Sequence, residues 1–244
     1  MNRTPSVAVV VGVGGGVGAA LADALVAQGR YDCVIGLARR RPDGWPDDPR
    51  RSFLQADILI ESDLAVAATA LRAHGTLDRI VVATGLLHGQ GVTPEKTLRT
   101  LDAASLMKLF AVNAIGPALV AKHLLPLTPK DRPSVFAALS ARVGSISDNR
   151  LGGWYGYRAS KAALNMLIAT LAIEHGRTRP LGVCVALHPG TVDTPLSQPF
   201  QQGVAEQSLF TPARSASALV ALMDGLGPQD NGGFFAWDGK PIAW

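Results

Sequence analysis

Short apolar runs alternate with longer segments of helical periodicity along the chain. The short runs are rich in β-branched residues, and the longer ones carry apolar residues at the i, i+3, i+4 and i+7 positions of a buried helical face. Such an alternation is typical of a parallel sheet covered by helices on both faces. We therefore predict a three-layer α/β fold with a doubly wound sheet of about seven mostly parallel strands.

The boundaries of these elements follow from turn and capping residues. Strands are predicted at residues 7–11, 31–38, 52–56, 80–83, 134–140, 183–187 and 234–237. Helices are predicted at residues 16–28, 62–74, 105–122, 156–175 and 212–224, with Ser62 and Thr211 as N-caps. No repeat or shift in composition divides the sequence, so a single domain over residues 1–244 is the simplest organisation.

Composition narrows the class of protein. Apolar residues make up 48% of the chain and charged residues 17%, a balance that favours a compact domain over a disordered chain. The net charge of +4 is modest and no long basic stripe is present, so we expect no binding to nucleic acid. No run reaches the ~18 consecutive apolar residues of a membrane span, so we expect no membrane helix and no targeting segment.

Cys33 and Cys184 are the only cysteines, and both lie in predicted strands. Buried free thiols are common in such positions and suit a reducing compartment, so we expect a cytoplasmic protein. The five histidines show no metal-ligand spacing. We interpret them as surface or loop residues and predict no metal site.

Three glycines mark the turn between the first predicted strand and the following helix. Gly12, Gly16 and Gly18 stand in a GxxxGxG spacing, which lets the backbone approach a phosphate at a helix N-terminus. An alternative GxGxxG frame through Gly14 places Val17 at its last position and fits less well. We therefore predict a dinucleotide-binding turn, with a merely flexible turn as the alternative.

The end of the second predicted strand reads GLARRRPD and has no carboxylate at Ala38. An acidic residue there would accept hydrogen bonds from the ribose hydroxyls of NAD, whereas Arg39 and Arg40 could pair with the 2′-phosphate of NADP. We therefore predict NADP rather than NAD, with a solvated basic loop as the alternative. Asp57, directly after the third predicted strand, either accepts a hydrogen bond from the adenine amine or begins a turn.

Tyr157 and Lys161 are the candidate reactive pair. They stand at i and i+4 of a predicted helix, so both side chains emerge on one face. A neighbouring ammonium favours the phenolate and would lower the Tyr157 pKa from its ordinary value of ~10. Such a pair is common on solvated helices, but this one opens the helix after the fifth predicted strand, beside the ligand crevice of a doubly wound sheet.

At these positions the sequence resembles the classical short-chain dehydrogenase/reductase family, over essentially the whole chain. The matching features are the glycine turn, Asp57, Asn113, the Ser140 region, the reactive pair and the segment HPGTVDT at residues 188–194. The segment GSISDNRLGGWYGYRASKAALN and the ending FAWDGKPIAW are most similar to the C-factor and Sniffer-like branch of that family.

The resemblance implies a Rossmann-type sheet and hydride transfer between a nicotinamide cofactor and a carbonyl or secondary alcohol. Tyr157 would be the general acid or base, Lys161 would hold the nicotinamide ribose, and a serine hydroxyl would polarise the carbonyl. The positions expected to contact the cofactor are Gly12, Gly16, Val17, Gly18, Arg39, Arg40, Asp57, Ile58, Ala83, Gly85, Pro189, Gly190, Val192 and Thr194. Members of the family usually form homodimers or homotetramers, and we expect the same here.

The serine departs from the family pattern. In the usual Ser-Ser-x-x-Gly arrangement the second serine carries the catalytic hydroxyl. In this chain Ala141 occupies the position of that second serine, and Ser140 lies one position earlier. Successive strand residues face opposite sides. Either a bulge turns Ser140 inward, or another hydroxyl such as Ser145 or Ser147 serves, or carbonyl polarisation is weaker. Among these we predict Ser140.

Asn113 would hold a water that links Lys161 to solvent in the family mechanism. Pro117, four residues later, has no N–H to bond the Asn113 carbonyl in an α-helix, which leaves that carbonyl free for a water. The alternative is that Pro117 merely kinks the helix.

Two functions remain open at this point. The first is an NADP-dependent reductase of a small-molecule ketone or aldehyde. The second is a non-catalytic dinucleotide-binding protein that signals or regulates on the same fold. The intact Tyr157 and Lys161 favour the enzyme, since a pure sensor has no need for a proton donor.

Overall fold

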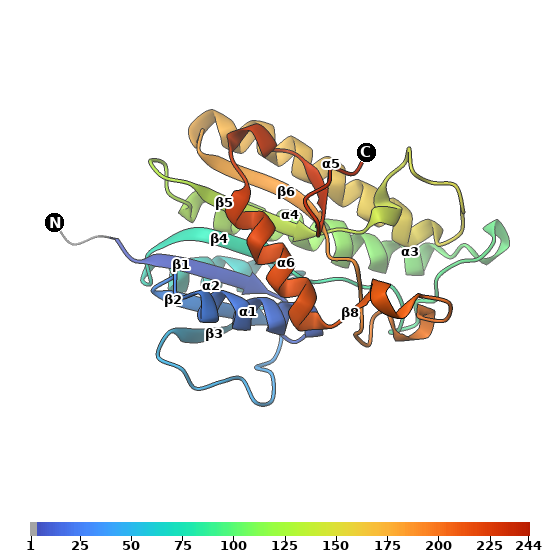
Figure 1. The fold of residues 1–244 in the computed structure, drawn as a ribbon, viewed down its shortest axis with the longest axis horizontal. Helices are drawn as coiled ribbons and strands as arrows, with labels where there is room; N and C mark the ends of the chain where they lie inside the picture. Colours follow the sequence, from blue (N-terminus) through green and yellow to red (C-terminus); the bar gives the residue numbers. More distant parts are fainter. Residues whose placement is uncertain (1–3) are drawn as a thin grey trace.

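The computed structural model describes residues 4–244, and a sheet of seven parallel strands runs through its centre (Figure 1). The strand order is β3-β2-β1-β4-β5-β6-β9, which confirms the predicted doubly wound sheet. The strands are β1 (Ser6–Val11), β2 (Cys33–Ala38), β3 (Arg51–Gln55), β4 (Thr76–Val82), β5 (Ser134–Leu139), β6 (Gly182–His188) and β9 (Phe234–Ala236). Two short strands, β7 (Thr191–Val192) and β8 (Leu209–Phe210), pair with each other outside this sheet.

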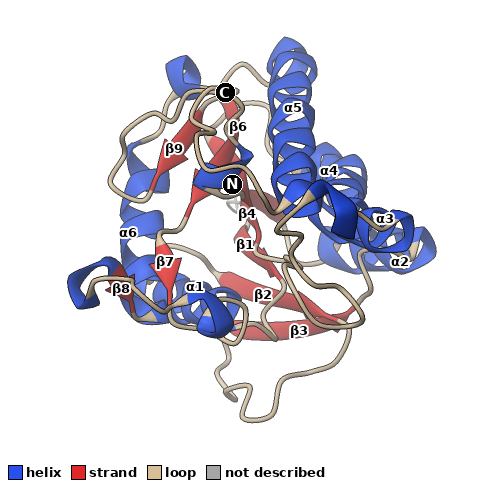
Figure 2. Cartoon of the chain, turned by 90° about the vertical axis from the view of Figure 1, so that its right-hand side faces the viewer, coloured by secondary structure: helices blue, strands red, loops and turns tan. Residues whose placement is uncertain are grey.

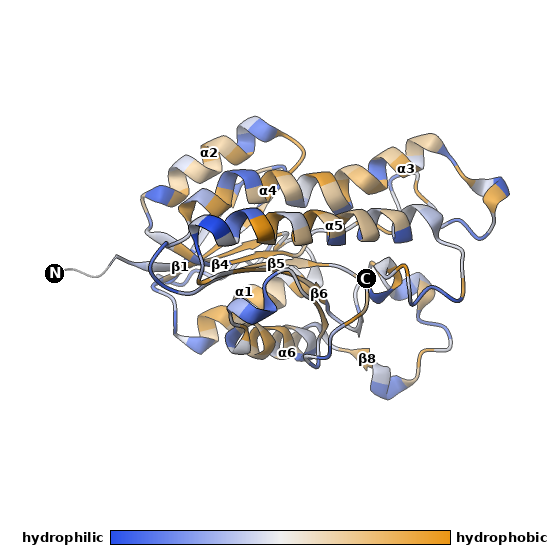
Figure 3. Ribbon diagram, turned by 90° about the horizontal axis from the view of Figure 1, so that it is seen from above, coloured by the Kyte–Doolittle hydropathy of each residue, from blue (hydrophilic) through white to orange (hydrophobic). Residues whose placement is uncertain are grey.

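Helices cover both faces of the sheet (Figure 3). One layer contains α1 (Gly16–Gln28) and α6 (Pro212–Gly225). The opposite layer contains α2 (Glu61–Arg72), α4 (Gly116–Leu124) and α5 (Tyr155–Thr178), and α3 (Ala103–Phe110) leads into α4. The alternation of apolar runs in the sequence therefore gives the three layers that it predicts.

The pleat of each strand divides the core between the two layers. In β1, Val7, Val9 and Val11 pack toward α2, α4 and α5, whereas Ala8 and Val10 pack toward α1 and α6. All five are exposed by 1% or less, because a parallel strand at the centre of such a sheet is covered on both sides. This explains why the strand reads as a continuous apolar run.

The predicted cap of α2 is wrong. The helix begins at Glu61 with Ile60 at the N-cap position, so Ser62 lies inside its first turn. Asp63, also in that turn, accepts a hydrogen bond from the Asp57 N–H at 3.0 Å. The side chain that links α2 to the chain after β3 is thus a carboxylate within the helix rather than a hydroxyl before it. By contrast, Thr211 caps α6 as predicted, accepting the Arg214 N–H.

The helix predicted at residues 105–122 is not a single regular helix. A π turn at Ala111–Ile115 separates α3 from α4, and there the Gly116 N–H donates to the Ala111 carbonyl. Pro117 follows directly and has no N–H to continue an α-helical ladder, which gives a physical reason for the wider turn. Asn113 is the central residue of this turn.

The run Ala103–Leu127, which contains this turn, is the one helical stretch within residues 4–244 that is long and apolar enough to cross a membrane. That criterion rests on length and composition alone. In the fold, Val120, Ala121 and Leu124 of this run are fully buried against the sheet. We therefore describe the run as part of the helical layer that contains α5.

The interpretation of all five histidines as surface or loop residues is wrong for His188, which ends strand β6 with its Nδ1 atom buried, and for His175 in α5. The His175 side chain is 7% exposed, and a Cβ placed at Gly182 would lie 2.7 Å from its Nε2 atom. The missing side chain of Gly182 makes room for the imidazole between α5 and β6. Burial and the nearby Arg179 charge lower the pKa of His175 from 6.5 to about 4, so it is neutral near pH 7.

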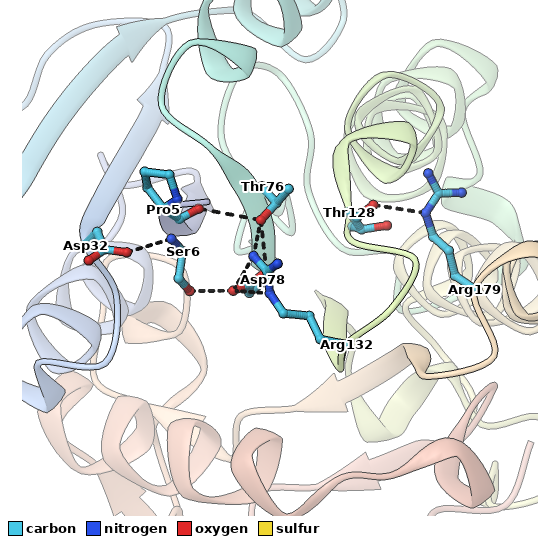
Figure 4. A network of polar contacts seen from close by, with 8 residues as sticks. All are labelled: Pro5, Ser6, Asp32, Thr76, Asp78, Thr128, Arg132 and Arg179. Atoms are coloured by element: carbon cyan, nitrogen blue, oxygen red, sulfur yellow. Dashed lines mark hydrogen bonds and ion pairs between the residues drawn. The ribbon is translucent and has the colours of Figure 1, made fainter. Parts of the chain in front are cut away.

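A polar network joins the amino ends of the central strands (Figure 4). In β1, the Ser6 N–H donates to Asp32 Oδ2 at 2.7 Å and the Ser6 hydroxyl donates to Asp78 Oδ2 at 2.5 Å. Arg132, just before β5, forms an ion pair with Asp78 at 3.0 Å and a hydrogen bond with Thr76. These contacts connect β1, β4 and the start of β5 at the edge opposite the glycine turn.

Candidate active site

A cavity of about 710 Å³ lies where β1, β2, β3 and β4 end, at the point where the strand order reverses. Doubly wound sheets bind their ligands at this edge, and a cavity of this size suits a cofactor. Several residues predicted to contact the cofactor line it: Gly12, Arg39, Arg40, Asp57, Ile58, Ala83 and Gly85. The cavity is therefore the candidate cofactor site.

Close backbone approach explains the three glycines of the turn after β1. Gly12 has a φ of +96°, and a Cβ at Gly18 would lie 2.3 Å from the Gly12 carbonyl oxygen. A Cβ at Gly16 would lie 2.9 Å from Thr194 Cγ2. A Cβ at Gly14, in contrast, would meet no atom within 4 Å. The geometry thus favours the GxxxGxG frame over the frame through Gly14.

The segment after β6 folds back over this turn (Figure 2). Thr194 lies against Gly16, and β7 and β8 pair beside α1 and α6. Gly190 reverses the chain with a φ of +82°, a left-handed conformation that glycine adopts without strain. The other predicted contacts of this segment are Pro189 and Val192, of which Val192 lies in β7. Val17, in the first turn of α1, is partly buried against the core between α1 and the sheet.

The residues of the cavity fit a dinucleotide. The Thr84 hydroxyl oxygen is buried beside Gly12 and has no hydrogen-bond partner within residues 4–244. Gly15, the N-cap of α1, offers no capping side chain, so the first N–H groups of α1 stay available to an anion. An unsatisfied buried hydroxyl beside free helix N–H groups is the arrangement that a phosphate-containing ligand would complete.

Arg39 and Arg40 lie at the end of β2 and line the same cavity. Both are exposed, and neither forms a hydrogen bond or ion pair with any residue of the described chain, 4–244. Their guanidinium groups are therefore available to a ligand. Asp57 Oδ1 accepts the Leu59 N–H at 2.9 Å, so this carboxylate begins a turn while it lines the cavity, and both interpretations of Asp57 remain.

Tyr157, Lys161 and Asn113 meet near the end of β4. Lys161 Nζ lies 5.9 Å from the centroid of the Tyr157 ring. A Cβ placed at Gly85 would lie 3.8 Å from both Lys161 Nζ and Asn113 Oδ1. Gly85 itself lines the cavity, so Lys161 and Asn113 lie directly behind one of its lining residues, and Tyr157 lies beside Lys161. The structure thus brings the predicted reactive residues next to the predicted cofactor residues.

Asn113 is fixed by its side chain. Its Oδ1 accepts the Leu86 N–H and its Nδ2 donates to the Leu86 carbonyl, each at 2.8 Å. The Nδ2 group also donates to Ser160 Oγ at 3.0 Å, which ties the π turn to α5. The amide thereby holds the chain after β4 in place. The water relay through the Asn113 carbonyl stays a prediction.

Burial dominates the protonation of the reactive pair. It raises the pKa of Tyr157 to about 12 and lowers the pKa of Lys161 to about 8. The prediction that Lys161 lowers the Tyr157 pKa is therefore wrong for the protein alone. The Lys161 ammonium instead donates to the Leu139 carbonyl at 2.8 Å. Near pH 7 Tyr157 is a neutral phenol, the form that can donate a proton.

Ser140 continues β5 without a bulge. Its N–H donates to the Leu187 carbonyl at 2.7 Å, and its hydroxyl donates to Asn165 Oδ1 of α5 at 2.6 Å. Ala141, one residue later, packs against the apolar cluster that contains Tyr157. The geometry therefore disfavours Ser140 as the group that polarises a carbonyl, because its single proton is already donated elsewhere.

The two alternative hydroxyls also have partners. Ser147 Oγ donates to the Trp244 carbonyl at 2.7 Å, and Ser145 Oγ accepts the Asp148 N–H at 3.2 Å. Because the Ser147 proton is already used, Ser145 is the donor of the 3.5 Å contact between the two hydroxyls. Weaker polarisation of the substrate carbonyl is thus the option that fits this structure best.

Sequence reasoning missed a cluster of rings beside Tyr157. Trp154, Phe200 and His88 gather there from three separate segments. Trp154 is adjacent to the reactive pair in the sequence GGWYGY, so its place near Tyr157 could have been predicted. Nothing in the sequence links Phe200 or His88 to Trp154. Within residues 4–244, no group of three or more His, Cys, Asp or Glu side chains is placed to hold a metal ion.

The parallel sheet, the glycine turn and the buried Tyr157 beside Lys161 define a dinucleotide-binding α/β oxidoreductase. The family described as short chain dehydrogenase matches residues 6–205. The chain belongs to the short-chain dehydrogenase family, which confirms the predicted nicotinamide-dependent oxidoreductase.

Individual relatives agree with this placement. The C-signal protein of Myxococcus xanthus is 35% identical over 60% of this chain and 83% of its own. Carbonyl reductase Sniffer of D. melanogaster superposes with a TM-score of 0.85 at 23% identity, over 99% of this chain and 100% of its own. NADPH-bound carbonyl reductase from chicken fatty liver superposes with a TM-score of 0.84 at 24% identity, over the full length of both chains. The structural likenesses show the Rossmann-type fold, and the predicted C-factor and Sniffer-like relatives are confirmed.

Proposed function

We propose that the protein reduces a ketone or aldehyde to the corresponding alcohol with NADPH, and oxidises the alcohol in the reverse direction. The observation that carries this proposal is the position of Tyr157, a buried neutral phenol beside Lys161, whose ammonium lies behind the cavity-lining Gly85. A phenol held there can give its proton to a carbonyl oxygen as negative charge develops on it.

Each residue of the site then has a role. Tyr157 donates the proton, and Lys161, an ammonium whose pKa is about 8, provides positive charge near it. Asn113 keeps the chain after β4 in place through both polar groups of Leu86. The bound nicotinamide supplies the hydride. Ala141 stands where a hydroxyl would otherwise polarise the carbonyl, so Tyr157 carries that task alone.

The cofactor would be held by the segments that surround the cavity. The turn from Gly12 to Gly18 would take the pyrophosphate, and residues 189–194 would take the nicotinamide end. Arg39 and Arg40 would pair with the 2′-phosphate, since both are free of other partners within residues 4–244. The NADPH-bound chicken enzyme supports NADPH as the cofactor of this fold.

The test is the consumption of NADPH and of NADH by the purified protein over a panel of ketones and aldehydes. We expect turnover with NADPH, a lower rate with NADH, and a loss of about 10²–10⁴ in rate for Tyr157→Phe with NADPH binding retained. Tight NADPH binding without turnover of any carbonyl would favour a non-catalytic binding protein instead. Preference for NADH would overturn the role of the two arginines.

We also propose that the protein forms a homodimer or homotetramer through its outer helices. Met166 and Ile173 lie one above the other on α5 and are 68% and 65% exposed. Met107 and Ile115, on the neighbouring run, are 67% and 51% exposed. An apolar patch of this kind is typical of an interface. Sedimentation of the protein and of Met166→Asp should give an assembly and a smaller species respectively.

We propose a cytoplasmic location on the basis of the two thiols. Cys33 and Cys184 are free, and Cys184 is buried in β6. Unpaired buried thiols suit a reducing compartment. Fractionation of cells with an antibody against the protein would place it, and recovery in a membrane or secreted fraction would contradict this location.

A further inference from the structure

The ring cluster beside Tyr157 joins three segments that are distant in the sequence. Trp154 and Tyr157 come from the start of α5, His88 follows β4, and Phe200 lies in the short helical turn Gln198–Phe200 between β7 and β8. The ring centroids lie 6.2 Å apart for Trp154–Tyr157, 4.9 Å for Trp154–Phe200 and 5.5 Å for His88–Phe200. Each pair meets edge to face, a favourable arrangement for aromatic rings.

Apolar side chains complete the surroundings of these rings. Leu86, Leu87, Val92 and Leu109 are buried with Tyr157 in one cluster. The half-buried members packed against it are Val112, Ala141, Val143, Trp154 and Phe200. Tyr157 itself is 8% exposed, so this cluster covers the side of the phenol that does not face Lys161. A substrate must therefore enter among these rings and aliphatic side chains.

Trp154 is held in this cluster through its backbone. It adopts a left-handed conformation, with φ 51° and ψ 41°, which a non-glycine residue keeps only when its surroundings hold it. Its N–H donates to the Glu95 carbonyl at 2.5 Å. The Glu95 carboxylate, 3% exposed, accepts the Gly156 N–H at 3.2 Å and so anchors the first turn of α5.

Phe200 joins the cluster from the turn Gln198–Phe200. The turn that carries it is closed by local hydrogen bonds, from the Phe200 N–H to the Ser197 carbonyl and from Gln201 to Asp193. It meets the chain after β4 through the hydrogen bond between His88 Nε2 and the Pro195 carbonyl at 3.0 Å. The Phe200 ring thus rests on Trp154 by ring contact, and another flat ring can take its place.

We propose that the substrates carry a planar aromatic ring next to the carbonyl, and that Trp154 and Phe200 determine this specificity. The substrate ring packs on Trp154 in the place that Phe200 occupies here, and Phe200 moves aside. A ring at that place has Trp154 as its neighbour, which is also the neighbour of Tyr157, and the attached carbonyl then extends toward the phenol. This inference rests on the carbonyl reductase activity proposed above.

A matched pair of substrates tests the inference, since acetophenone and cyclohexyl methyl ketone differ in flatness more than in size. We expect the protein to favour acetophenone by roughly fivefold or more in kcat/KM. Trp154→Leu should remove most of that preference. Trp244→Leu, which removes a half-exposed ring outside this cluster, should leave it unchanged.

Phe200→Ala should act in the opposite direction to Trp154→Leu. Because it removes the ring that competes with the substrate, we expect the KM for acetophenone to fall severalfold while that for cyclohexyl methyl ketone changes less. Equal kcat/KM for the two ketones, or a preference that persists in Trp154→Leu, would overturn the inference.

A binding measurement separates this inference from the proposed activity. Benzamide and cyclohexanecarboxamide are not reduced, and their binding in the presence of NADP⁺ can be followed by quenching of Trp154 fluorescence, with Trp154→Leu as the blank. Stronger binding of benzamide supports the ring site whether or not any ketone is turned over. If ketones are turned over but both amides bind equally well, the proposed aromatic site on Trp154 is wrong and the proposed reductase activity is unaffected.

Discussion

The Ser140 hydroxyl donates to Asn165 Oδ1 across 2.6 Å, and this bond directs it toward α5. Both side chains are buried, with exposures of 4% and 2%. The residue that packs with Tyr157 instead is Ala141. Ser140 therefore stabilises the contact between β5 and α5, and the position beside the phenol carries no hydroxyl.

Ser140→Ala should affect stability more than catalysis. Removal of the donor leaves the buried Asn165 oxygen unsatisfied, which costs about 1–3 kcal/mol of the free energy of unfolding. We expect kcat/KM to change by less than about threefold. Urea unfolding and steady-state kinetics on the same preparation measure both effects. A drop of a hundredfold in kcat with unchanged stability would restore Ser140 to the catalytic role.

Ala141→Ser should act as a gain of function. The new hydroxyl would stand in the cluster with Tyr157 and could donate to the developing charge on the carbonyl oxygen. Since a single such donor is worth about 10²–10³ in kcat in well-formed oxyanion sites, we expect an increase of at least about tenfold here. The matched control is Ala141→Cys, which adds similar bulk with a weaker donor. Equal rates for the two variants would contradict this explanation.

Arg39 and Arg40 should set the choice of cofactor. Replacing both by Ala removes charge-assisted hydrogen bonds to the 2′-phosphate that are together worth about 1.5–3 kcal/mol at this exposed site, so the KM for NADPH should rise by about 10–100-fold. The KM for NADH should change little, because NADH lacks that phosphate. Arg158→Ala, which removes an arginine of α5 bound to backbone carbonyls, serves as the control for loss of charge. An equal rise for both cofactors would argue against phosphate recognition.

Two glycines of the turn should respond differently to the same substitution. Gly18→Ala places a Cβ 2.3 Å from the Gly12 carbonyl oxygen, so we expect a loss of about 1–3 kcal/mol in stability together with weaker NADPH binding. Gly14→Ala meets no atom within 4 Å and should change stability by less than about 0.5 kcal/mol. Thermal unfolding of the two variants makes the comparison. Similar losses of stability in the two variants would show that close contact with the Gly12 carbonyl is not the reason for glycine at position 18.

His175 should make the free energy of unfolding depend on pH. Its pKa is about 4 in the fold and 6.5 in an unfolded chain, so between these values the unfolded state binds a proton that the folded state does not. The free energy of unfolding therefore falls as the pH is lowered from about 6.5 to about 4. In His175→Gln this dependence should be shallower. Urea unfolding at several pH values compares the slopes, and equal slopes would contradict a buried neutral imidazole.

The sequence predicts the sheet well because strand burial leaves a direct pattern. A central parallel strand such as β1 is apolar at every position, and the α1 boundaries follow from the glycines that flank it. The cap of α2 could not be found in this way. There the chain enters the helix from the Asp57 turn, no side chain caps the first turn, and Asp63 inside the helix instead accepts the N–H of Asp57 before it.

Site residues that belong to one continuous motif were predicted from the sequence. Site residues that contact one another only after distant segments fold together were missed. The glycine turn and the pair Tyr157 and Lys161 are local patterns. The contact of Phe200 with Trp154 depends on how the chain after β7 returns over α5, which no local pattern records. The direction of the Ser140 side chain likewise depends on Asn165, a partner on another element.

The polar network of Ser6, Asp78 and Arg132 lies at the edge of the sheet opposite the candidate cofactor site. It ties β1 and β4 to the segment before β5 through side chains that lie away from the loops lining the cavity. Loops that do not carry the framework can change in length and composition at low cost to stability. A protein built in this way can evolve toward new substrates by exchanging the segment around Phe200 while its sheet stays as it is.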